Sequence, residues 1–301
     1  MGTQKQIWGH LAAFFSIFVW GITFISTKVL LVSFTPLEII FFRLLLAVLT
    51  LFIISPPRLN RNEIARTALQ DKWKPMAAGL CGVTLYFIFQ NIALTYTLAA
   101  NVGVLVSVAP LFIALASYAV LHEKLKGNFF IGFTAAIAGI ILIAFNGSFV
   151  LKLNPLGDLL SILAALAWTF YSVLIKKINA PQTAVFALTR KVFFYGFLFT
   201  LPILPLFEFR WGLDRLTSLP NILNLAFLGV VASALCFVTW NYAVHVLGPV
   251  KTSVYIYMVP VITIVSSALI LHETISLVSG VGTVLILVGM LLSEREKTKN
   301  A

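Results

Sequence analysis

Ten apolar runs, most of them long enough to form a membrane-crossing helix, dominate this chain. They occupy residues 10–31, 36–55, 76–97, 101–121, 129–146, 157–175, 184–205, 222–244, 251–271 and 276–292, approximately. At 1.5 Å of rise per residue, about twenty helical residues cross the ~30 Å hydrocarbon core of a bilayer. The composition agrees, because 60% of the 301 residues are hydrophobic and only 10% are charged. The pattern predicts an all-α integral membrane protein with ten transmembrane helices.

The net charge of +11 is distributed between the apolar runs and forms no continuous basic stripe. This distribution argues against nucleic acid as a partner and instead indicates orientation, since cytoplasmic loops of membrane proteins are enriched in Lys and Arg. The 56–74 loop carries Arg58, Arg61, Arg66, Lys72 and Lys74, whereas the connection around 97–101 carries no basic residue. We therefore expect a multi-pass protein of the cell (inner or plasma) membrane, with both termini cytoplasmic.

An internal repeat appears when the chain is compared with itself at an offset of 150 residues. The identical pairs are Gly79 and Gly229, Asn91 and Asn241, Pro110 and Pro260, His122-Glu123 and His272-Glu273, Gly132 and Gly282, and Gly139 and Gly289. Earlier in each half the offset shifts by two or three residues and pairs Trp20 with Trp168, Lys28 with Lys176, and Arg43 with Arg190. The repeat predicts two related halves, residues 1–151 and 152–301.

Each predicted half contains an odd number of helices, so the second half must enter the membrane from the opposite side to the first. The sequence thus predicts two inverted five-helix repeats. Inverted repeats have two nearly equivalent packings, one open to each side, around a site near the bilayer midplane. This architecture predicts a secondary transporter that works by alternating access.

The chain also resembles the drug/metabolite transporter superfamily, in particular its EamA-like branch. The resemblance covers essentially the whole chain, and its residues are Trp20, Gly21, Phe24, Pro36, Arg43, Ala93, Leu94, Pro110, Glu123, Trp168, Tyr171, Lys176, Pro260, Glu273 and the glycines of the last run. It implies a ten-helix carrier whose central cavity is lined mainly by the first, third, fourth, sixth, eighth and ninth helices. Members of this kind are commonly exporters of amino acids or other metabolites.

Prolines and arginines inside the apolar runs are candidates for the transport chemistry. Pro110 and Pro260 lie near the middle of the fourth and ninth runs, where they free backbone carbonyls that need a partner or a watery cavity. Arg43 and Arg190 lie within the second and seventh runs, and a charge inside a membrane indicates function by default. The alternatives are a packing kink for the prolines and a structural tie between helices for the arginines.

Acidic residues are absent from the middle of every apolar run. This argues against an exchanger of lipophilic cations and favours neutral, zwitterionic or anionic solutes. Uncharged polar and aromatic side chains at central depth are the remaining candidates for the cavity wall, although aromatic residues in membrane helices also serve packing. The predicted substrate pathway comprises Trp20, Arg43, Tyr86, Asn91, Pro110, Trp168, Tyr171, Arg190, Trp240, Asn241, Tyr257 and Pro260.

Enzymatic chemistry has no matching motif in this sequence. The strings HEKLK and HETIS lack the second histidine of a zinc-protease motif, and no phosphate-binding glycine loop or nucleophile elbow is present. We therefore predict no enzyme activity, no cofactor and no metal. The expected function is movement of an amino acid or similar neutral or zwitterionic solute, with export as the expected direction. An organic-anion or sugar-phosphate exchanger is the alternative, and a receptor or membrane-embedded enzyme is the alternative from another class. The expected partners are a small-molecule substrate, the lipid bilayer and, as a further assembly, a second copy of the chain.

Overall fold

The computed structural model describes residues 2–55, 73–97, 99–123, 127–145, 154–178, 184–206, 209, 214–271 and 277–294. Regular structure in this part of the chain is helical throughout. Six helices are long and apolar enough to cross a membrane, namely Gln4–Leu30, Pro36–Ile54, Trp73–Tyr96, Pro155–Ile178, Val185–Pro205 and Leu219–Leu247. Shorter apolar helices are Ala109–Leu121, Gly127–Leu142 and Gly280–Ser293. The chain is therefore a helical membrane protein with several membrane-spanning segments.

The first half begins with two long helices, and its third membrane-spanning segment contains a π-helical stretch, Leu80–Leu85. Its α-helices are α1 (Gly2–Leu30), α2 (Pro36–Ile54), α4 (Trp73–Gly79), α5 (Tyr86–Tyr96), α6 (Ala99–Val106), α7 (Ala109–Leu121) and α8 (Gly127–Phe145). Most of the basic 56–74 loop lies outside the described residues, as do Lys124 and Lys126.

The second half repeats this order, and it also has a π-helical stretch, Phe227–Leu235. Its α-helices are α9 (Pro155–Ile178), α10 (Val185–Thr200), α11 (Leu219–Ala226), α12 (Cys236–Leu247), α13 (Pro249–Val254), α14 (Met258–Leu271) and α15 (Leu277–Glu294). Short 3₁₀ segments occupy Leu201–Leu206, Asp214–Thr217 and Tyr255–Tyr257. The predicted anchors His272 and Glu273 lie outside the described residues.

The fourth and ninth apolar runs are each interrupted just before a proline. α6 ends at Val106 and α7 begins at Ala109, with Pro110 in its first turn. In the second half the 3₁₀ segment Tyr255–Tyr257 separates α13 from α14, which contains Pro260 near its start. A proline lacks the amide hydrogen and clashes with the preceding turn, whereas it is well accommodated in the first turn of a helix. Each run therefore forms two α-helices in place of one.

The start of α2 is held by a capping box. The side chain of Thr35 accepts a hydrogen bond from the Glu38 amide, and the Glu38 carboxylate accepts one from the Thr35 amide at 2.7 Å. Arg215, from the second half, forms an ion pair with Glu38 at 2.8 Å and donates to the Ser33 carbonyl at 2.9 Å. Glu38 is fully buried, and this pairing compensates for the loss of water around its charge.

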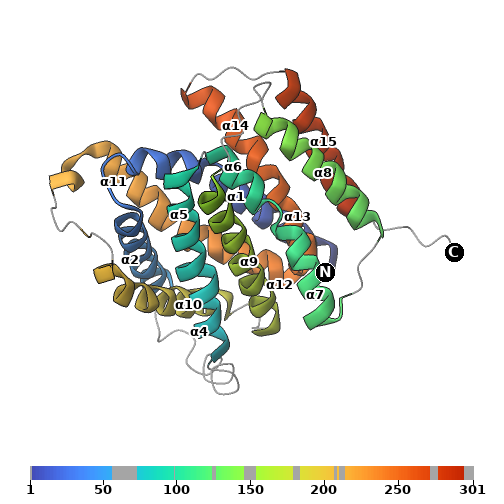
Figure 1. The fold of residues 1–301 in the computed structure, drawn as a ribbon. Helices are drawn as coiled ribbons and strands as arrows, with labels where there is room; N and C mark the ends of the chain where they lie inside the picture. Colours follow the sequence, from blue (N-terminus) through green and yellow to red (C-terminus); the bar gives the residue numbers. More distant parts are fainter. Residues whose placement is uncertain are drawn as a thin grey trace.

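Helices of the two halves pack on one another in a reciprocal pattern (Figure 1). α1 contacts α12 and α14, while α9, in the middle of the molecule, contacts α5 and α7. α8 and α15 lie side by side at one edge. A methyl group added to Gly132 would overlap the backbone of Gly289, and one added to Gly139 would overlap that of Gly282. Glycine at these positions lets the two helices approach closely, as small residues do in membrane proteins.

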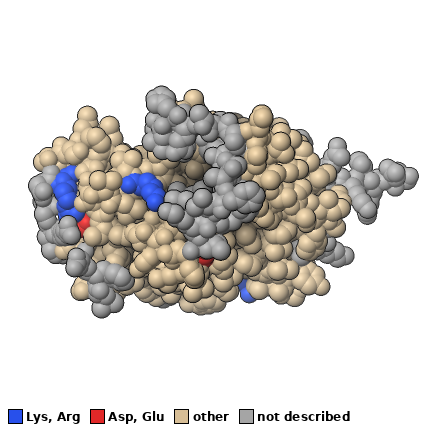
Figure 2. Space-filling model, turned by 45° about the horizontal axis from the view of Figure 1, so that its top comes forward, with Lys and Arg blue, Asp and Glu red and all other residues tan. Residues whose placement is uncertain are grey.

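The outer surface suits contact with lipid. Figure 2 shows one face on which isolated Lys and Arg atoms stand on a largely uncharged surface. Large apolar side chains are exposed along the helices, including Ile53, Leu269 and Val284. In water such exposure would be unfavourable, whereas the hydrocarbon of a bilayer solvates it.

Candidate functional site

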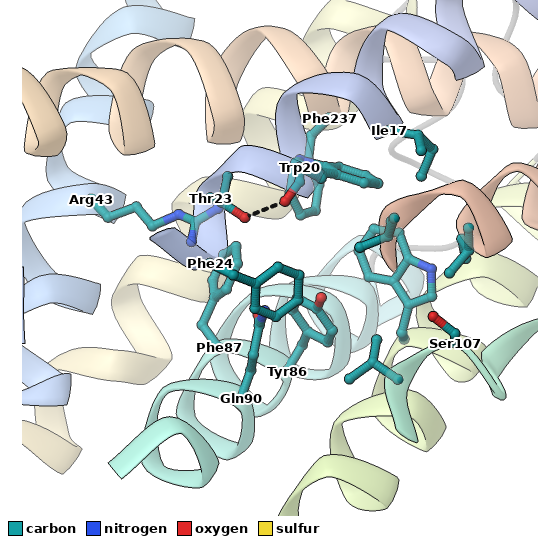
Figure 3. Close-up of a pocket in the computed structure, with 14 residues that line it drawn as sticks. Ile17, Trp20, Thr23, Phe24, Arg43, Tyr86, Phe87, Gln90, Ser107 and Phe237 are labelled. Atoms are coloured by element: carbon teal, nitrogen blue, oxygen red, sulfur yellow. Dashed lines mark hydrogen bonds between the residues drawn. The ribbon is translucent and has the colours of Figure 1, made fainter. Parts of the chain in front are cut away.

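A cavity lies between the two halves and is lined by residues from seven of the α-helices (Figure 3). Its lining residues are Ile17, Trp20, Thr23 and Phe24 of α1, Arg43 of α2, Tyr86, Phe87 and Gln90 of α5, Val106 of α6, Ser107, Trp168 of α9, Phe237 of α12, Ile256 of the 3₁₀ segment Tyr255–Tyr257, and Val259 of α14. The cavity has a volume of about 40 Å³. That volume holds a few water molecules, so a metabolite requires the lining side chains to move apart.

Arg43 brings a full positive charge into this cavity. Its side chain is 4% exposed, and its Nε donates a hydrogen bond to the Ser233 hydroxyl at 2.6 Å. The guanidinium also lies 4.0 Å from the centre of the Phe87 ring, and in Figure 3 it points from α2 toward Thr23 and Phe24. Among the described residues no carboxylate lies within ion-pair distance of it. A buried cation in this position favours an anionic group in the cavity.

Six of the other thirteen lining residues are aromatic. Trp20 and Trp168 meet edge to face, with ring centroids 5.2 Å apart, and Tyr86 lies 5.1 Å from Trp168. Phe237 packs against both tryptophans. Such rings present flat apolar faces that suit an apolar or aromatic side chain of a solute.

The indole of Trp168 is the clearest unused hydrogen-bond donor of the wall. Trp168 is 3% exposed, and its Nε1 has no hydrogen-bond partner among the described residues. By contrast, Trp20 donates its Nε1 proton to the Ala232 carbonyl at 2.8 Å. A buried donor without a partner is costly in the absence of a ligand or water, so Trp168 is suited to donate to a bound solute.

The two helix interruptions open onto the same cavity. Val106 and Ser107 precede α7, and Ile256 lies in the 3₁₀ segment before α14. The Ser107 hydroxyl itself donates to the Gly103 carbonyl at 2.6 Å. Pro110 and Pro260 themselves are not among the lining residues, whereas residues of the interruptions before them are.

Several predicted site residues are close to the cavity but serve the structure around it. Asn91 donates to the Pro36 carbonyl at 3.4 Å. Tyr171 donates to the Asn241 side-chain oxygen at 2.6 Å, and the Asn241 amide donates to the Thr189 hydroxyl at 2.9 Å. Trp240 packs on Trp20 with centroids 5.1 Å apart. These side chains are buried and connect helices, so the structure places them behind the wall.

Two further predicted residues lie away from the described cavity. Tyr257 belongs to a separate hydrophobic cluster and packs near Phe133 of α8, with ring centroids 6.4 Å apart. Arg190, the repeat mate of Arg43, lies over the ring of Phe52 at 5.3 Å. One of its terminal nitrogens, Nη1, is buried without a hydrogen-bond partner in the described part of the chain.

Sequence reasoning missed several wall residues, notably Phe24, Phe87 and Phe237. Two simple signals would have pointed to them. Phe24 lies one helical turn after Trp20, on the same face of α1. Phe87 and Phe237 are identical at the 150-residue offset of the repeat.

A wider opening of about 460 Å³ lies one helical turn farther along α1 and α5. Its lining residues are Lys28, Leu31, Val32, Ser33, Phe34, Thr35, Pro36, Leu94, Thr95 and Arg215. Lys28 follows Phe24 by one turn of α1, and Leu94 follows Gln90 by one turn of α5. The opening therefore lies beyond the cavity, toward the C-terminal ends of α1 and α5.

Glu123 follows the end of α7 and lies near the C-terminal end of α9. Partial burial raises the pKa of its carboxyl above the ordinary value, and the positive charge of Lys176 opposes that shift. His122 ends α7 in the left-handed conformation, with φ of 56°. Groups of three or more potential metal ligands do not occur among the described residues.

Comparison with known proteins gives consistent relatives. The model of the EamA-like transporter family matches the chain twice, at residues 7–145 and 155–294. An uncharacterized transporter of Archaeoglobus fulgidus is 26% identical over 291 residues, covering 94% of this chain and 96% of its own length. A probable terminal-alkyne amino-acid exporter of Streptantibioticus cattleyicolor is 25% identical, covering 98% and 95%. A probable amino-acid metabolite efflux pump of Escherichia coli is also 25% identical, covering 91% of each chain.

A solved crystal structure shares the fold, with a TM-score of 0.76 over 95% of this chain and 95% of its own at 18% identity. The match to the family model, which extends over most of the chain, confirms the EamA-like resemblance, and it indicates a transporter and not an enzyme. The chain therefore belongs to the EamA-like transporter family, within the drug/metabolite transporter superfamily.

Proposed function

We propose that this protein is a secondary transporter that exports an amino acid or similar small metabolite by alternating access. The observation that carries the proposal is Arg43, a buried cation that faces a cavity between the two halves and has no carboxylate partner among the described residues. Such a charge is costly in a membrane unless it serves a ligand or a pathway. The names of two relatives, an amino-acid exporter and an amino-acid metabolite efflux pump, support the solute class and the direction.

The alternating mechanism rests on two halves, residues 1–151 and 152–301, related by a two-fold axis in the membrane plane. Contacts between repeat-related positions support this relation. Gly132 meets Gly289, and the exchanged pair, Gly282 and Gly139, also meets. A two-fold axis produces this reciprocity, because each contact must recur with its partners exchanged.

The third helix of each half supports the same relation. Gly79 packs on the backbone of α10 at Val192, and Gly229 packs on the backbone of α2 at Arg43. The π-helical stretches Leu80–Leu85 and Phe227–Leu235 also overlap at the 150-residue offset. π-helical stretches often mark functional sites, and these two flank the cavity. We propose ten membrane-crossing segments, of which the fourth and ninth are interrupted.

In our proposal the protein lies in the cell membrane with both termini cytoplasmic. The wide opening near Lys28 then faces outward, since α1 starts on the inner side and ends at this opening. Export then requires the solute to enter from the cytoplasmic side, where α1 begins at Gly2, and to leave through this opening.

The test is exchange of radiolabelled solutes by the purified protein in liposomes. We expect amino acids to exchange at a rate well above that of protein-free liposomes, and Arg43→Gln to abolish most of this exchange. Lys177→Gln is a matched control, because Lys177 is an exposed cation at the end of α9, away from the cavity. Equal exchange by the wild type and Arg43→Gln would contradict the proposal.

An organic-anion exchanger is the second candidate. It is favoured by the lining itself, which contains one arginine and no acidic residue among the described residues. A panel that includes dicarboxylates and sugar phosphates distinguishes the two. Faster exchange of these solutes than of any amino acid would favour the second candidate.

A further inference from the structure

We infer that the cavity recognises the carboxylate and the apolar side chain of its solute but not the amino group, so that 2-hydroxy acids are ligands equivalent to the corresponding amino acids. The inference deepens the proposed function and rests on it. It concerns the chemistry of the cavity around Arg43, Tyr86 and Trp168.

The position of the Arg43 charge suits a carboxylate. Arg43 is held by the Ser233 hydroxyl at Nε and by the Phe87 ring, whose centroid lies 4.0 Å from the guanidinium carbon. This arrangement uses Nε and one face of the group, and it leaves the terminal nitrogens for another acceptor. Arginine presents these nitrogens as a planar fork that matches a carboxylate. A carboxylate bound there would neutralise a cation that is 4% exposed.

A complementary anion is absent from the described part of the cavity wall. The described lining residues include no aspartate or glutamate. Other described acids lie outside this lining: Glu38 is paired with Arg215, Asp158 lies in the first turn of α9, and Glu123 lies beyond the end of α7. A site that bound an ammonium group specifically would need a carboxylate or several converging acceptors.

The remaining polar and aromatic groups of the wall are only weak partners for an amino group. The uncharged polar side chains of the wall, Thr23, Gln90 and Ser107, offer an ammonium group only neutral oxygens as acceptors. The Thr23 and Ser107 hydroxyls already donate to backbone carbonyls and keep only their lone pairs for a solute. The aromatic faces of Trp20, Tyr86 and Trp168 can attract a cation, but such contacts change affinity by roughly tenfold. The Trp168 indole is a donor, and its unpaired Nε1–H suits an oxygen and not an ammonium group.

These features of the cavity predict an order of ligand affinity. A hydroxyl in place of the amino group keeps the carboxylate and the side chain, so the affinity stays within about tenfold. An amide in place of the carboxylate removes the anion and leaves a cationic ligand beside Arg43. Loss of one partner of a buried charge pair lowers affinity by roughly 100-fold or more.

The experiment measures binding by isothermal titration calorimetry with the purified full chain in detergent at pH 7.5. The ligands are L-phenylalanine, 3-phenyllactate and phenylalaninamide, with leucine, 2-hydroxy-4-methylpentanoate and leucinamide as a second series. Binding is preferred to flux, because the protonated form of a hydroxy acid crosses lipid without a carrier. The amino acid and the hydroxy acid are expected to bind within about tenfold of each other in at least one series, with the amide roughly 100-fold weaker.

Variants test whether Arg43 produces this order. Arg43→Gln should weaken both acids by roughly 100-fold and remove the preference over the amide. Arg43→Lys keeps the charge and should retain the preference with weaker binding, because lysine lacks the fork. Lys177→Gln, the matched control, should bind all ligands as the wild type does. The wild-type ligand series alone decides the question if an Arg43 variant does not fold.

Three results would overturn the inference: a hydroxy acid 100-fold weaker than its amino acid, an amide as tight as its amino acid, or no binding of any of these carboxylates by folded protein. Liposome exchange separates this failure from failure of the proposed function. Exchange of amino acids without binding of hydroxy acids leaves the transporter proposal standing and removes this inference. Binding of both acids without exchange of any solute leaves this inference standing and removes the transporter proposal.

Discussion

Trp20 and Trp168 meet edge to face across the interface between the two halves, with centroids 5.2 Å apart and ring planes at 88°. They are repeat mates, yet their indole donors differ in use. Trp20 donates to the Ala232 carbonyl, whereas the Trp168 Nε1 has no partner among the described residues. The same residue type is thus a tie between helices in one half and an unused donor at the cavity in the other.

This difference predicts that replacing tryptophan by phenylalanine affects solute binding at one position and stability at the other. Trp168→Phe keeps a ring but removes the donor, so we expect weaker solute binding, by up to about tenfold, with little change in stability. Trp20→Phe leaves the Ala232 carbonyl without its donor and should lower the free energy of unfolding by about 1 kcal/mol. Thermal unfolding in detergent and solute binding, measured on both variants, separate the two effects. A stability loss in Trp168→Phe equal to that in Trp20→Phe would contradict this distinction.

The hydrogen bonds of Tyr171 and Asn241 make a second prediction. Tyr171→Phe leaves the Asn241 side-chain oxygen buried without the 2.6 Å donor, at a cost of about 1–3 kcal/mol in the free energy of unfolding. Tyr86→Phe is the control at the cavity wall and should unfold as the wild type does. Urea or thermal unfolding of the two proteins in detergent checks this. Equal unfolding of both variants would show that the Tyr171 bond does not stabilise the fold.

The contact between α8 and α15 makes a third prediction. Gly139→Ala and Gly289→Ala place a methyl group against the facing backbone and should destabilise the protein by roughly 1–3 kcal/mol. Gly280→Ala, also on α15, meets nothing within 4 Å and should be neutral or stabilising, since alanine favours the helix. Thermal unfolding of the three variants measures this. If all three behave alike, close packing does not determine the requirement for glycine.

Orientation is testable with single cysteines after replacement of Cys81 and Cys236 by alanine. Val32→Cys, in the exposed turn after α1, should react with an impermeant thiol reagent applied outside intact cells. Lys177→Cys, near the C-terminal end of α9, should react only after the membrane is permeabilised, because basic residues favour the cytoplasmic side. Reaction of both from the outside would exclude the proposed topology.

The sequence by itself determined much of the architecture. A membrane protein follows from the apolar runs, since no other solvent accommodates so much apolar surface. The interruptions before Pro110 and Pro260 follow from proline chemistry, which acts on the adjacent turn and needs no tertiary contact. The family resemblance followed from residues in order along the chain, and the family match bears it out.

The cavity wall was decided only in the tertiary structure. Arg43 and Arg190 are equivalent in sequence, and their helices α2 and α10 have repeat-related neighbours, yet the first faces the cavity and the second lies over Phe52. Asn91 and Asn241 look equally suited to a solute until their partners, Pro36 and Thr189, are known. Polar groups in a membrane interior bind whichever acceptor the folded helices bring within reach, and that distance is a property of helix packing and not of position in the sequence.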